Sequence, residues 1–224
     1  MITTTDTALL RLLQLSSATL PVGGYAFSQG LEYAVDSGWL TDAEDVSQWL
    51  SVQIQRSLTH VDVALLSRQM ASARIADKQA MRYWNRYTLA CRETYELRLN
   101  DTAMGAAMNR LLTSLDVPMP LQGEAEVTFI AAFAMAAVHW QIDTRTAAHG
   151  YLWAWLENQV TAATKLVPLG QTRAQQLLGE LLTLIPPAVD QAMTLEDDQI
   201  GYSLPGVAMA SVWHEDQYSR LFRS

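Results

Sequence analysis

Apolar side chains recur along most of this chain every three or four residues, which is the spacing of amphipathic α-helices. The alternating apolar and polar pattern of β-strands, bounded by turn dipeptides, is rare. The spacing therefore predicts an all-α fold, a single globular domain of roughly eight to ten helices over residues 1–224. The predicted helices cover 5–16, 29–37, 62–74, 100–115, 127–138, 143–165 and 171–184, with further helices beginning at 41 and 77.

Capping residues and breaks mark the ends of several of these helices. Thr41 and Glu44 have the spacing of a capping box, and Asp77 is a favourable N-cap. The clearest interruption is 117–123, which holds two prolines and a glycine. This segment could act as a hinge between subdomains, but neither half of the chain has a composition of its own, so we expect one domain.

The connection between the first two predicted helices is a sharp corner, with the sequence LPVGGY at 20–25. Pro21 has no backbone N–H and disfavours helical geometry at the residue before it, and the two glycines permit positive φ. We expect this corner to expose Tyr25 and Ser28. On these residues alone, an ordinary turn between helices is a more common explanation than a functional loop.

The amino-acid composition argues against several classes of protein and of binding partner. The chain is 50% hydrophobic and 17% charged, which argues against disorder, and its net charge of −8 argues against sequence-independent nucleic-acid binding. The single cysteine, Cys91, suits a reducing compartment. The most apolar run, 127–138, is too short to cross a bilayer. With no secretory signal at its start, we expect a cytoplasmic protein without nucleic-acid or membrane partners.

Sequence motifs of catalysis and cofactor binding are missing. The chain has no GxxxxGK[ST] phosphate loop, no GxGxxG and no GxSxG, so we expect neither an enzyme nor a cofactor. The four histidines leave one alternative open, a metal-binding helical enzyme that uses His60, Asp62, His139 or His149. Helices that pair carboxylates with histidines in the ExxH pattern are lacking, so we assign no metal ligand, and a structural role is the commoner one for each histidine.

Lys165 and the end of the chain carry the most informative charges. Lys165 either caps the end of a helix or meets a carboxylate of a partner, because it lies just before a Pro-Leu-Gly break. On a helix, Tyr218, Leu221 and Phe222 would share one face. Ordering 216–224 costs more backbone entropy than burying these three side chains returns. We therefore expect that a partner, and not the chain itself, holds this tail.

Three stretches together resemble one family. They are SSATLPVGGYAFSQGLEYAVDSGW at 16–39, KLVPLGQ at 165–171 and SVWHEDQYSRLFRS at 211–224. In this order and at these places they resemble the urease accessory protein UreF family, and the resemblance covers nearly the whole chain. The last stretch is the most specific of the three.

The resemblance implies a role in urease maturation. Members of the family are helical dimers that join the accessory protein UreD, called UreH in some systems, to the GTPase UreG. The complex acts on urease apoprotein and assists nickel insertion, with the UreF-like protein as scaffold and regulator of the GTPase. Small residues at 103–107, AMGAA, would permit the close helix contact of a homodimer.

The resemblance also implies which residues bind partners. In the family the C-terminal segment becomes ordered against UreD, so we expect a partner-binding tail from about 205. The residues that match the corner, the central motif and the tail of the family are Tyr25, Ser28, Gln29, Gly30, Glu32, Lys165, Pro168, Gly170, Gln171, His214, Glu215, Gln217, Tyr218, Arg220 and Arg223.

Overall fold

The computed structural model describes residues 5–121 and 123–223, and within them helices are the only regular secondary structure. The all-α prediction is confirmed. The α-helices are α1 (Asp6–Leu15), α2 (Leu31–Asp36), α3 (Ala43–Val52), α4 (Ala64–Arg74), α5 (Lys78–Ala90), α6 (Tyr95–Ser114), α7 (Phe129–His139), α8 (Thr144–Leu166), α9 (Gln171–Leu182), α10 (Ile185–Thr194) and α11 (Pro205–Glu215). Two short 3-10 helices, Gly24–Ala26 and Asp197–Gln199, lie between them.

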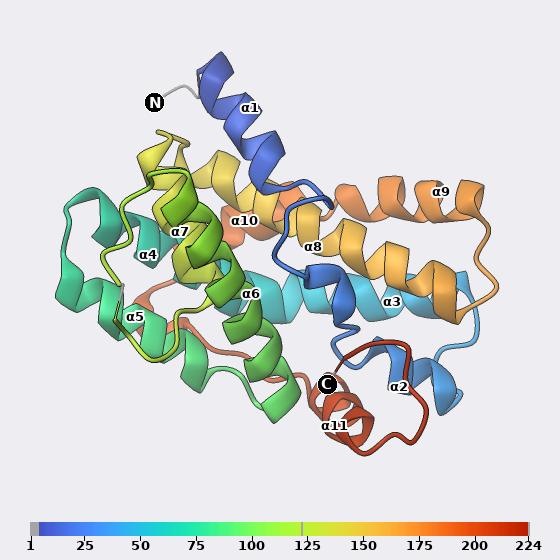
Figure 1. Cartoon of the computed structure of the whole chain (residues 1–224). Helices are drawn as coiled ribbons and strands as arrows, with labels where there is room; N and C mark the ends of the chain where they lie inside the picture. Colours follow the sequence, from blue (N-terminus) through green and yellow to red (C-terminus); the bar gives the residue numbers. More distant parts are fainter. Residues whose placement is uncertain (1–4, 122, 224) are drawn as a thin grey trace.

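A long central helix organises the molecule. The π-helical segment η2, Gln53–Val63, joins α3 to α4 without a break, so Ala43–Arg74 forms one helix (Figure 1). The sequence pattern predicted two separate helices here. With α3 and α4 joined, the described residues form ten continuous α-helices, within the predicted range.

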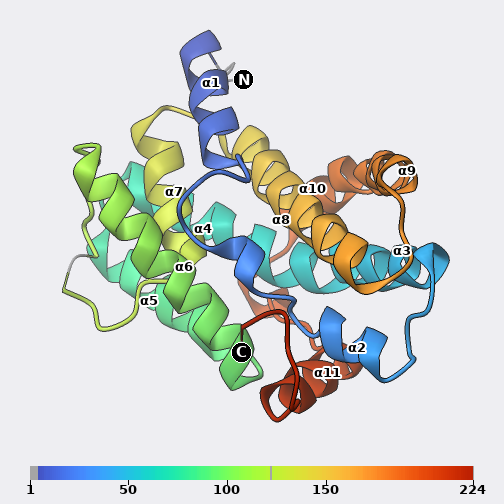
Figure 2. The same ribbon diagram turned by 45° about the vertical axis from the view of Figure 1, so that its right-hand side comes forward.

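The other helices pack on either half of this central helix. Helices α5 and α7 contact α4, and α6 packs on α7; α9 contacts α3, and α10 contacts η2, with α8 packed against α9 and α10. Helix α1 projects from the body, while α2 and α11 lie together at the opposite side (Figures 1 and 2). The predicted buried run is found in α7, where residues 130–137 are all buried.

Of the two predicted helix starts, one is found in place and the other is shifted by one residue. Asp77 caps α5 as predicted. The N-cap of α3 is Asp42, because its side chain accepts the N–H groups of Glu44 and Asp45, while Asp45 reaches back to the N–H of Thr41. The capping interaction exists, shifted by one residue from the predicted Thr41–Glu44 pair.

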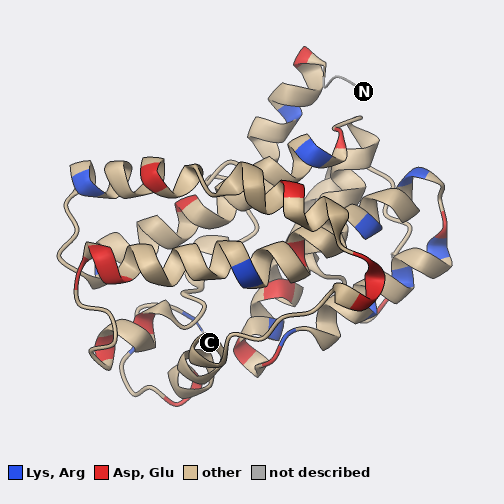
Figure 3. Cartoon of the chain, turned by 180° about the vertical axis from the view of Figure 1, so that it is seen from behind, with Lys and Arg blue, Asp and Glu red and all other residues tan. Residues whose placement is uncertain are grey.

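Among the small residues at 103–107, Gly105 is buried against another segment of the same chain. A Cβ on Gly105 would lie 1.9 Å from the carbonyl oxygen of Val127, so only glycine allows this segment to cross α6. The close approach predicted for a dimer is thus made within one chain at this position. Charges of both signs are spread over the surface without forming one continuous face in the view of Figure 3. None of the described helices combines the length and apolarity needed to span a bilayer.

Candidate functional site

The corner between α1 and α2 turns by positive φ values at Gly23, Gln29 and Gly30. Tyr25 is 60% exposed, as predicted. Ser28 is fully buried, which corrects the prediction that the corner exposes it. The reason is local: the backbone reverses at Gln29 and Gly30, directly after Ser28, and this reversal folds Ser28 inward.

Gly30 lets α11 approach the start of α2. Its φ of +82° is in the region that favours glycine, and a Cβ there would lie 3.1 Å from the Cβ of Ala210 and 3.1 Å from the backbone nitrogen of Ser211. Two residues further on, Glu32 lies in the first turn of α2, and its carboxylate contacts His214 on α11. The corner is therefore shaped to receive the C-terminal helix.

Gln29 connects the same corner to α8 by a hydrogen bond. A non-glycine residue at φ +54° is uncommon and stores backbone strain. The side-chain oxygen of Gln29 accepts a hydrogen bond from Trp155 Nε1 at 2.8 Å. This contact lies at the edge of an interior cavity of about 130 Å³.

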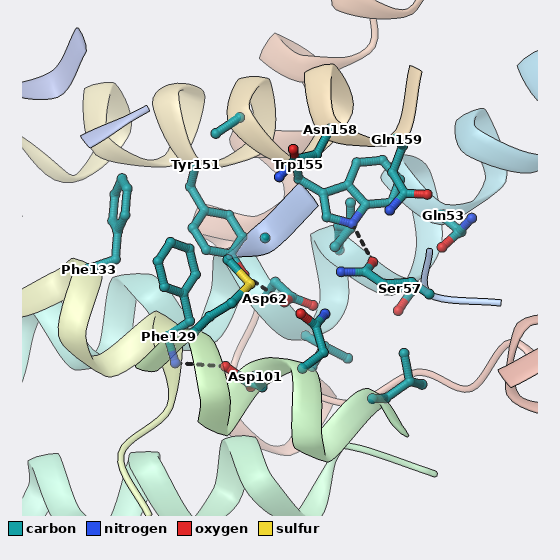
Figure 4. Close-up of a pocket in the computed structure, with 18 of the residues that line it drawn as sticks. Gln53, Ser57, Asp62, Asp101, Phe129, Phe133, Tyr151, Trp155, Asn158 and Gln159 are labelled. Atoms are coloured by element: carbon teal, nitrogen blue, oxygen red, sulfur yellow. Dashed lines mark hydrogen bonds between the residues drawn. The ribbon is translucent and has the colours of Figure 1, made fainter. Parts of the chain in front are cut away.

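Figure 4 shows the cavity, with Tyr151 and Trp155 on α8 above Asp62 on η2 and Asp101 on α6. Arg92 lies between two buried carboxylates, 2.9 Å from Asp62 and 2.7 Å from Asp101. The Tyr151 hydroxyl donates to Asp62 at 3.0 Å. Burial alone would lower the pKa of Arg92, but Asp62 and Asp101 outweigh it and raise the pKa, so the guanidinium stays charged.

A second buried cluster joins the corner to the tail. His214, fully buried on α11, places Nε2 2.9 Å from a Glu32 carboxylate oxygen and Nδ1 2.8 Å from a Glu96 carboxylate oxygen. Burial alone would lower the pKa of His214, but the hydrogen bonds to Glu96 and Glu32 outweigh it and raise the pKa. His214 was predicted to be a partner-binding residue, yet here it binds its own chain.

The tail beyond α11 is seated on the corner. Glu32 accepts the backbone N–H groups of Leu221 and Phe222 at 2.6 and 3.0 Å, and the N–H of Arg223 donates to the carbonyl of Ala26 at 2.7 Å. The Phe222 side chain is only 7% exposed. The expectation that the chain itself does not hold its tail is therefore wrong, because backbone hydrogen bonds to Glu32 add to the side-chain burial considered from sequence.

This tail segment is not helical, so its predicted shared face does not form. Phe222 turns inward, while Leu221 is 71% exposed and Tyr218 is fully exposed. Arg220 donates to the carbonyls of His214 and Glu215, which are acceptors at the end of α11. The ring of Phe222 makes a cation–π contact with Lys165, whose Nζ lies 5.5 Å from the ring centroid.

The remaining predicted residues divide between the cluster and a separate turn. Glu215 caps the start of α6 by accepting the Glu96 N–H, and Gln217 donates to Ser219 within the tail. Pro168 and Gly170 are exposed in the turn from α8 to α9, and Gln171 is the exposed first residue of α9. The structure thus brings the corner, Lys165 and the tail together and leaves the rest of the central motif on that turn.

Sequence reasoning missed Glu96, Arg92 and Asp101. Glu96 is two residues into α6 and reads as an ordinary first-turn acid. Arg92 and Asp101 are nine residues apart without a motif. The stretch 91–101, CRETYELRLND, has more charged than apolar residues, so no local signal marked these charges as buried pairs.

The ligands considered for a metal-binding enzyme do not converge. His60 contacts the carbonyl of Arg56 and the side chain of Gln191, and Asp62 is bound to Arg92. His139 is exposed at the end of α7. Among the described residues, no group of three or more His, Cys, Asp or Glu side chains is placed to hold a metal ion.

Comparison with known proteins assigns the chain to a family. A family model described as UreF matches residues 40–182, more than half of the chain. The chain belongs to the UreF family. A protein from Marinomonas sp. (strain MWYL1) named "Urease accessory protein UreF" is 53% identical over 223 residues, covering 100% of this chain and 97% of the relative.

Further UreF relatives match with similar coverage. Proteins of the same name from Alkalilimnicola ehrlichii and Pseudomonas putida (strain W619) are 49% and 46% identical, covering 96% and 98% of this chain and 95% and 99% of the relatives. The UreF resemblance seen in the three sequence stretches is confirmed. UreF proteins are non-catalytic accessory proteins, which agrees with the prediction that this chain is not an enzyme. The corner and the tail lie outside residues 40–182, but the full-length matches include them.

Proposed function

We propose that this chain is a scaffold of urease maturation, which joins a UreD-type (UreH-type) accessory protein and a UreG-type GTPase on urease apoprotein. In this role it regulates the GTPase and assists the insertion of nickel, which is the cargo of the complex. The proposal rests on the names of the relatives, which describe them as urease accessory proteins. It also rests on the surface formed by the corner and the tail.

The single observation that carries the proposal is that the corner and the tail, which are far apart in the sequence, are in direct contact in the structure. Glu32 of the corner and Leu221 of the tail are separated by 189 positions, yet the carboxylate accepts the tail backbone at 2.6 Å. The corner and the tail, which the resemblance implied as partner-binding, are therefore joined by buried contacts, and their exposed residues are available to a partner. A scaffold needs such residues in fixed relation, because it holds several partners at once.

The chemistry of this surface suits protein binding. Tyr25, Tyr218 and Leu221 are exposed apolar or amphipathic side chains, and the cations Lys165, beside Phe222, and Arg223, bonded to Ala26, are exposed as well. Aromatic residues and arginine are enriched among side chains that dominate interface energetics. Exposed apolar side chains gathered beside charges are typical of a contact patch for another protein.

A binding experiment with the UreD-type protein tests the proposal. Tyr218→Ala and Leu221→Ala together remove two exposed side chains of the tail, and we expect affinity for the partner to fall at least roughly tenfold. The matched control is Ile75→Ala with Tyr83→Ala, which removes one exposed aliphatic and one exposed aromatic side chain, just after α4 and on α5. Equal affinity of the tail variant and the control, with both folded by circular dichroism, would contradict the proposal.

The homodimer implied by the resemblance is also part of the proposal, with a different contact from the one predicted. Helix α1 projects from the body and leaves Leu9, Leu10 and Leu13 exposed. These leucines, and not the buried Gly105, offer an apolar face to a second copy. Light scattering of Leu10→Ser with Leu13→Ser should show a smaller mass than the unchanged chain, and unchanged mass would exclude α1 as the contact.

A further inference from the structure

A groove of about 490 Å³ opens between α4, α5 and α7, on the side of the molecule away from α2 and α11 (Figures 1 and 2). Met81 on α5 and Met135 on α7 line its base and are only 1% and 5% exposed. The segment 118–120 and the turn from α4 to α5 complete the lining. We propose that this groove docks an acidic amphipathic segment of another protein.

The loop between α6 and α7 is held against the groove by contacts of its own. Val117 and Leu121 are buried in the core, and Met119 between them is half-buried against it. Glu124, further along the loop, pairs with Arg82 on α5 at 2.9 Å. The clearest interruption in the sequence is therefore a fixed part of the groove, and it places Met119 among the lining residues.

The lining is apolar and adaptable. Three of the chain's nine methionines line this one groove, together with Pro118 and Pro120. Methionine side chains are unbranched and polarisable, so they fit apolar side chains of different shapes. Proline has no backbone N–H, so this part of the lining offers few donors to a small polar ligand. The lining therefore suits the apolar face of a protein segment, such as a helix laid into a groove.

Cations without partners lie at the groove. Lys78 lines it, and Arg74 is the last residue of α4. Both are exposed, and neither side chain makes a hydrogen bond or ion pair within the part of the chain that the structure describes. The acid beside Lys78 in the sequence, Asp77, is already used as the N-cap of α5, where it accepts two backbone N–H groups. None of the described lining residues is acidic.

This region is basic, although the chain as a whole is acidic. The stretch 74–86 holds four of the 15 Lys and Arg residues and one acidic residue, in a chain with a net charge of −8. The turn from α4 to α5, at the right of Figure 3, carries several of the blue segments. Glu124 is shared between Arg82 and Arg86, so it does not neutralise both.

The sign of this charge identifies the occupant. Complementary charges steer a partner to a surface and fix its orientation, and they disfavour partners of the same sign. Exposed cations beside an apolar groove therefore select a segment that carries carboxylates next to its apolar face. The groove is separate from the corner and the tail, so it adds a second binding surface to the proposed function and does not depend on it.

A synthetic helical peptide with leucines on one face and glutamates on the other tests the proposal on the full chain. Nuclear magnetic resonance of the methionine methyl groups locates where the peptide binds. We expect the signals of Met81, Met119 and Met135 to shift, while those of Met104 on α6 and Met193 on α10 stay unchanged. A matched peptide with lysines in place of the glutamates should bind at least roughly threefold more weakly, because it faces cations of the same sign.

Reversal of one charge gives a variant that keeps the fold. Lys78→Glu places a carboxylate at the first position of α5, where the helix dipole favours it. Affinity for the glutamate peptide should fall roughly three- to tenfold, and affinity for the lysine peptide should rise. The matched control Arg56→Glu reverses an exposed cation on η2 and should leave both affinities unchanged. Circular dichroism checks that both variants are folded.

Several results would overturn the proposal. They are equal affinity for the two peptides, an unchanged affinity in Lys78→Glu, and a glutamate peptide that shifts none of the three groove signals. Groove signals that shift with protein concentration alone would assign the groove to a second copy of the chain. Vesicles of phosphatidylserine and phosphatidylcholine that shift these signals, where the glutamate peptide does not, would assign it to a membrane surface.

The proposed function fails by a different result. It is tested by Tyr218→Ala with Leu221→Ala, which alters the tail and leaves the groove intact. Loss of the glutamate peptide in Lys78→Glu, together with unchanged affinity of the tail variant for the UreD-type protein, would keep the groove and refute the tail surface. The opposite pair of results would refute the groove alone.

Discussion

Two buried clusters of this molecule each hold one basic side chain between two carboxylates. In the interior, Arg92 lies between Asp62 and Asp101, and at the corner His214 lies between Glu32 and Glu96. In both, one carboxylate also accepts backbone N–H groups. Asp101 accepts that of Phe129 at the start of α7, and Glu32 accepts those of Leu221 and Phe222.

The difference between the clusters lies in the basic side chain and in the segment that it secures. An arginine keeps its charge at every pH at which a protein is folded, and this one secures the start of a core helix. A histidine changes its charge near neutral pH, and this one secures the end of the chain. The same arrangement therefore makes a permanent connection in the core and a conditional one at the tail.

Removing the cation of the interior cluster should have the largest effect on stability. Arg92→Met leaves Asp62 and Asp101 buried without a partner, and we expect the free energy of unfolding to fall by about 3–5 kcal/mol. Urea denaturation measures it. Arg82→Met, which breaks an exposed pair with Glu124, should cost under about 1 kcal/mol. A loss for Arg92→Met no larger than this control would refute the importance of the permanent cluster.

Changing the basic side chain at the corner should cost less and act mainly on the tail. His214→Gln keeps a hydrogen-bond donor but removes the charge, so we expect a loss of about 1–3 kcal/mol in the free energy of unfolding. The same denaturation experiment compares it with Arg92→Met. If His214→Gln destabilised the chain more than Arg92→Met, the histidine cluster would be part of the core rather than a connection to the tail.

The pH dependence of stability should separate the clusters further. The pKa of His214 is raised in the folded chain, so its stabilisation is complete below the ordinary histidine value of about 6.5 and is lost as pH rises through the higher folded value. Denaturation midpoints of the unchanged chain should therefore decline on the alkaline side of neutrality. In His214→Gln this decline should be absent, whereas Arg82→Met should keep it.

Lys165→Ala should have the smallest effect on stability. The ammonium is exposed and contributes through the ring of Phe222, worth about 0.5–1 kcal/mol at an exposed site. We expect urease activation in cells to fall by more than this change in stability explains, because the cation is part of the proposed partner surface. Parallel losses in melting temperature and activation would show that Lys165 is structural.

Local sequence patterns predicted much of the fold. The buried run of α7, the cap at Asp77 and the corner at Pro21 follow from apolar spacing, an N-cap side chain and the missing N–H of proline. The continuous helix Ala43–Arg74 did not follow, because its π-helical centre has no sequence signature that separates it from two ordinary helices.

The site could be predicted only in part, for a physical reason. Residues of the corner and of the tail were identified separately. The contact between the two segments depends on Glu96 and on backbone N–H groups. Every residue except proline has a backbone N–H, so the sequence does not show which of these groups make the contact. The burial of Ser28 likewise depends on the positive φ of Gln29, a residue that rarely adopts it. Contacts that join distant parts of the chain set these features, and local patterns do not record them.

The charge of His214 is the quantity on which the conditional connection depends. Nuclear magnetic resonance titration can follow its imidazole together with the amides of Leu221 and Phe222. We predict an imidazole pKa above the ordinary value of about 6.5, with both amide signals moving in the same step. An imidazole that titrates below this value, or amide signals that stay at random-coil positions throughout, would contradict the account.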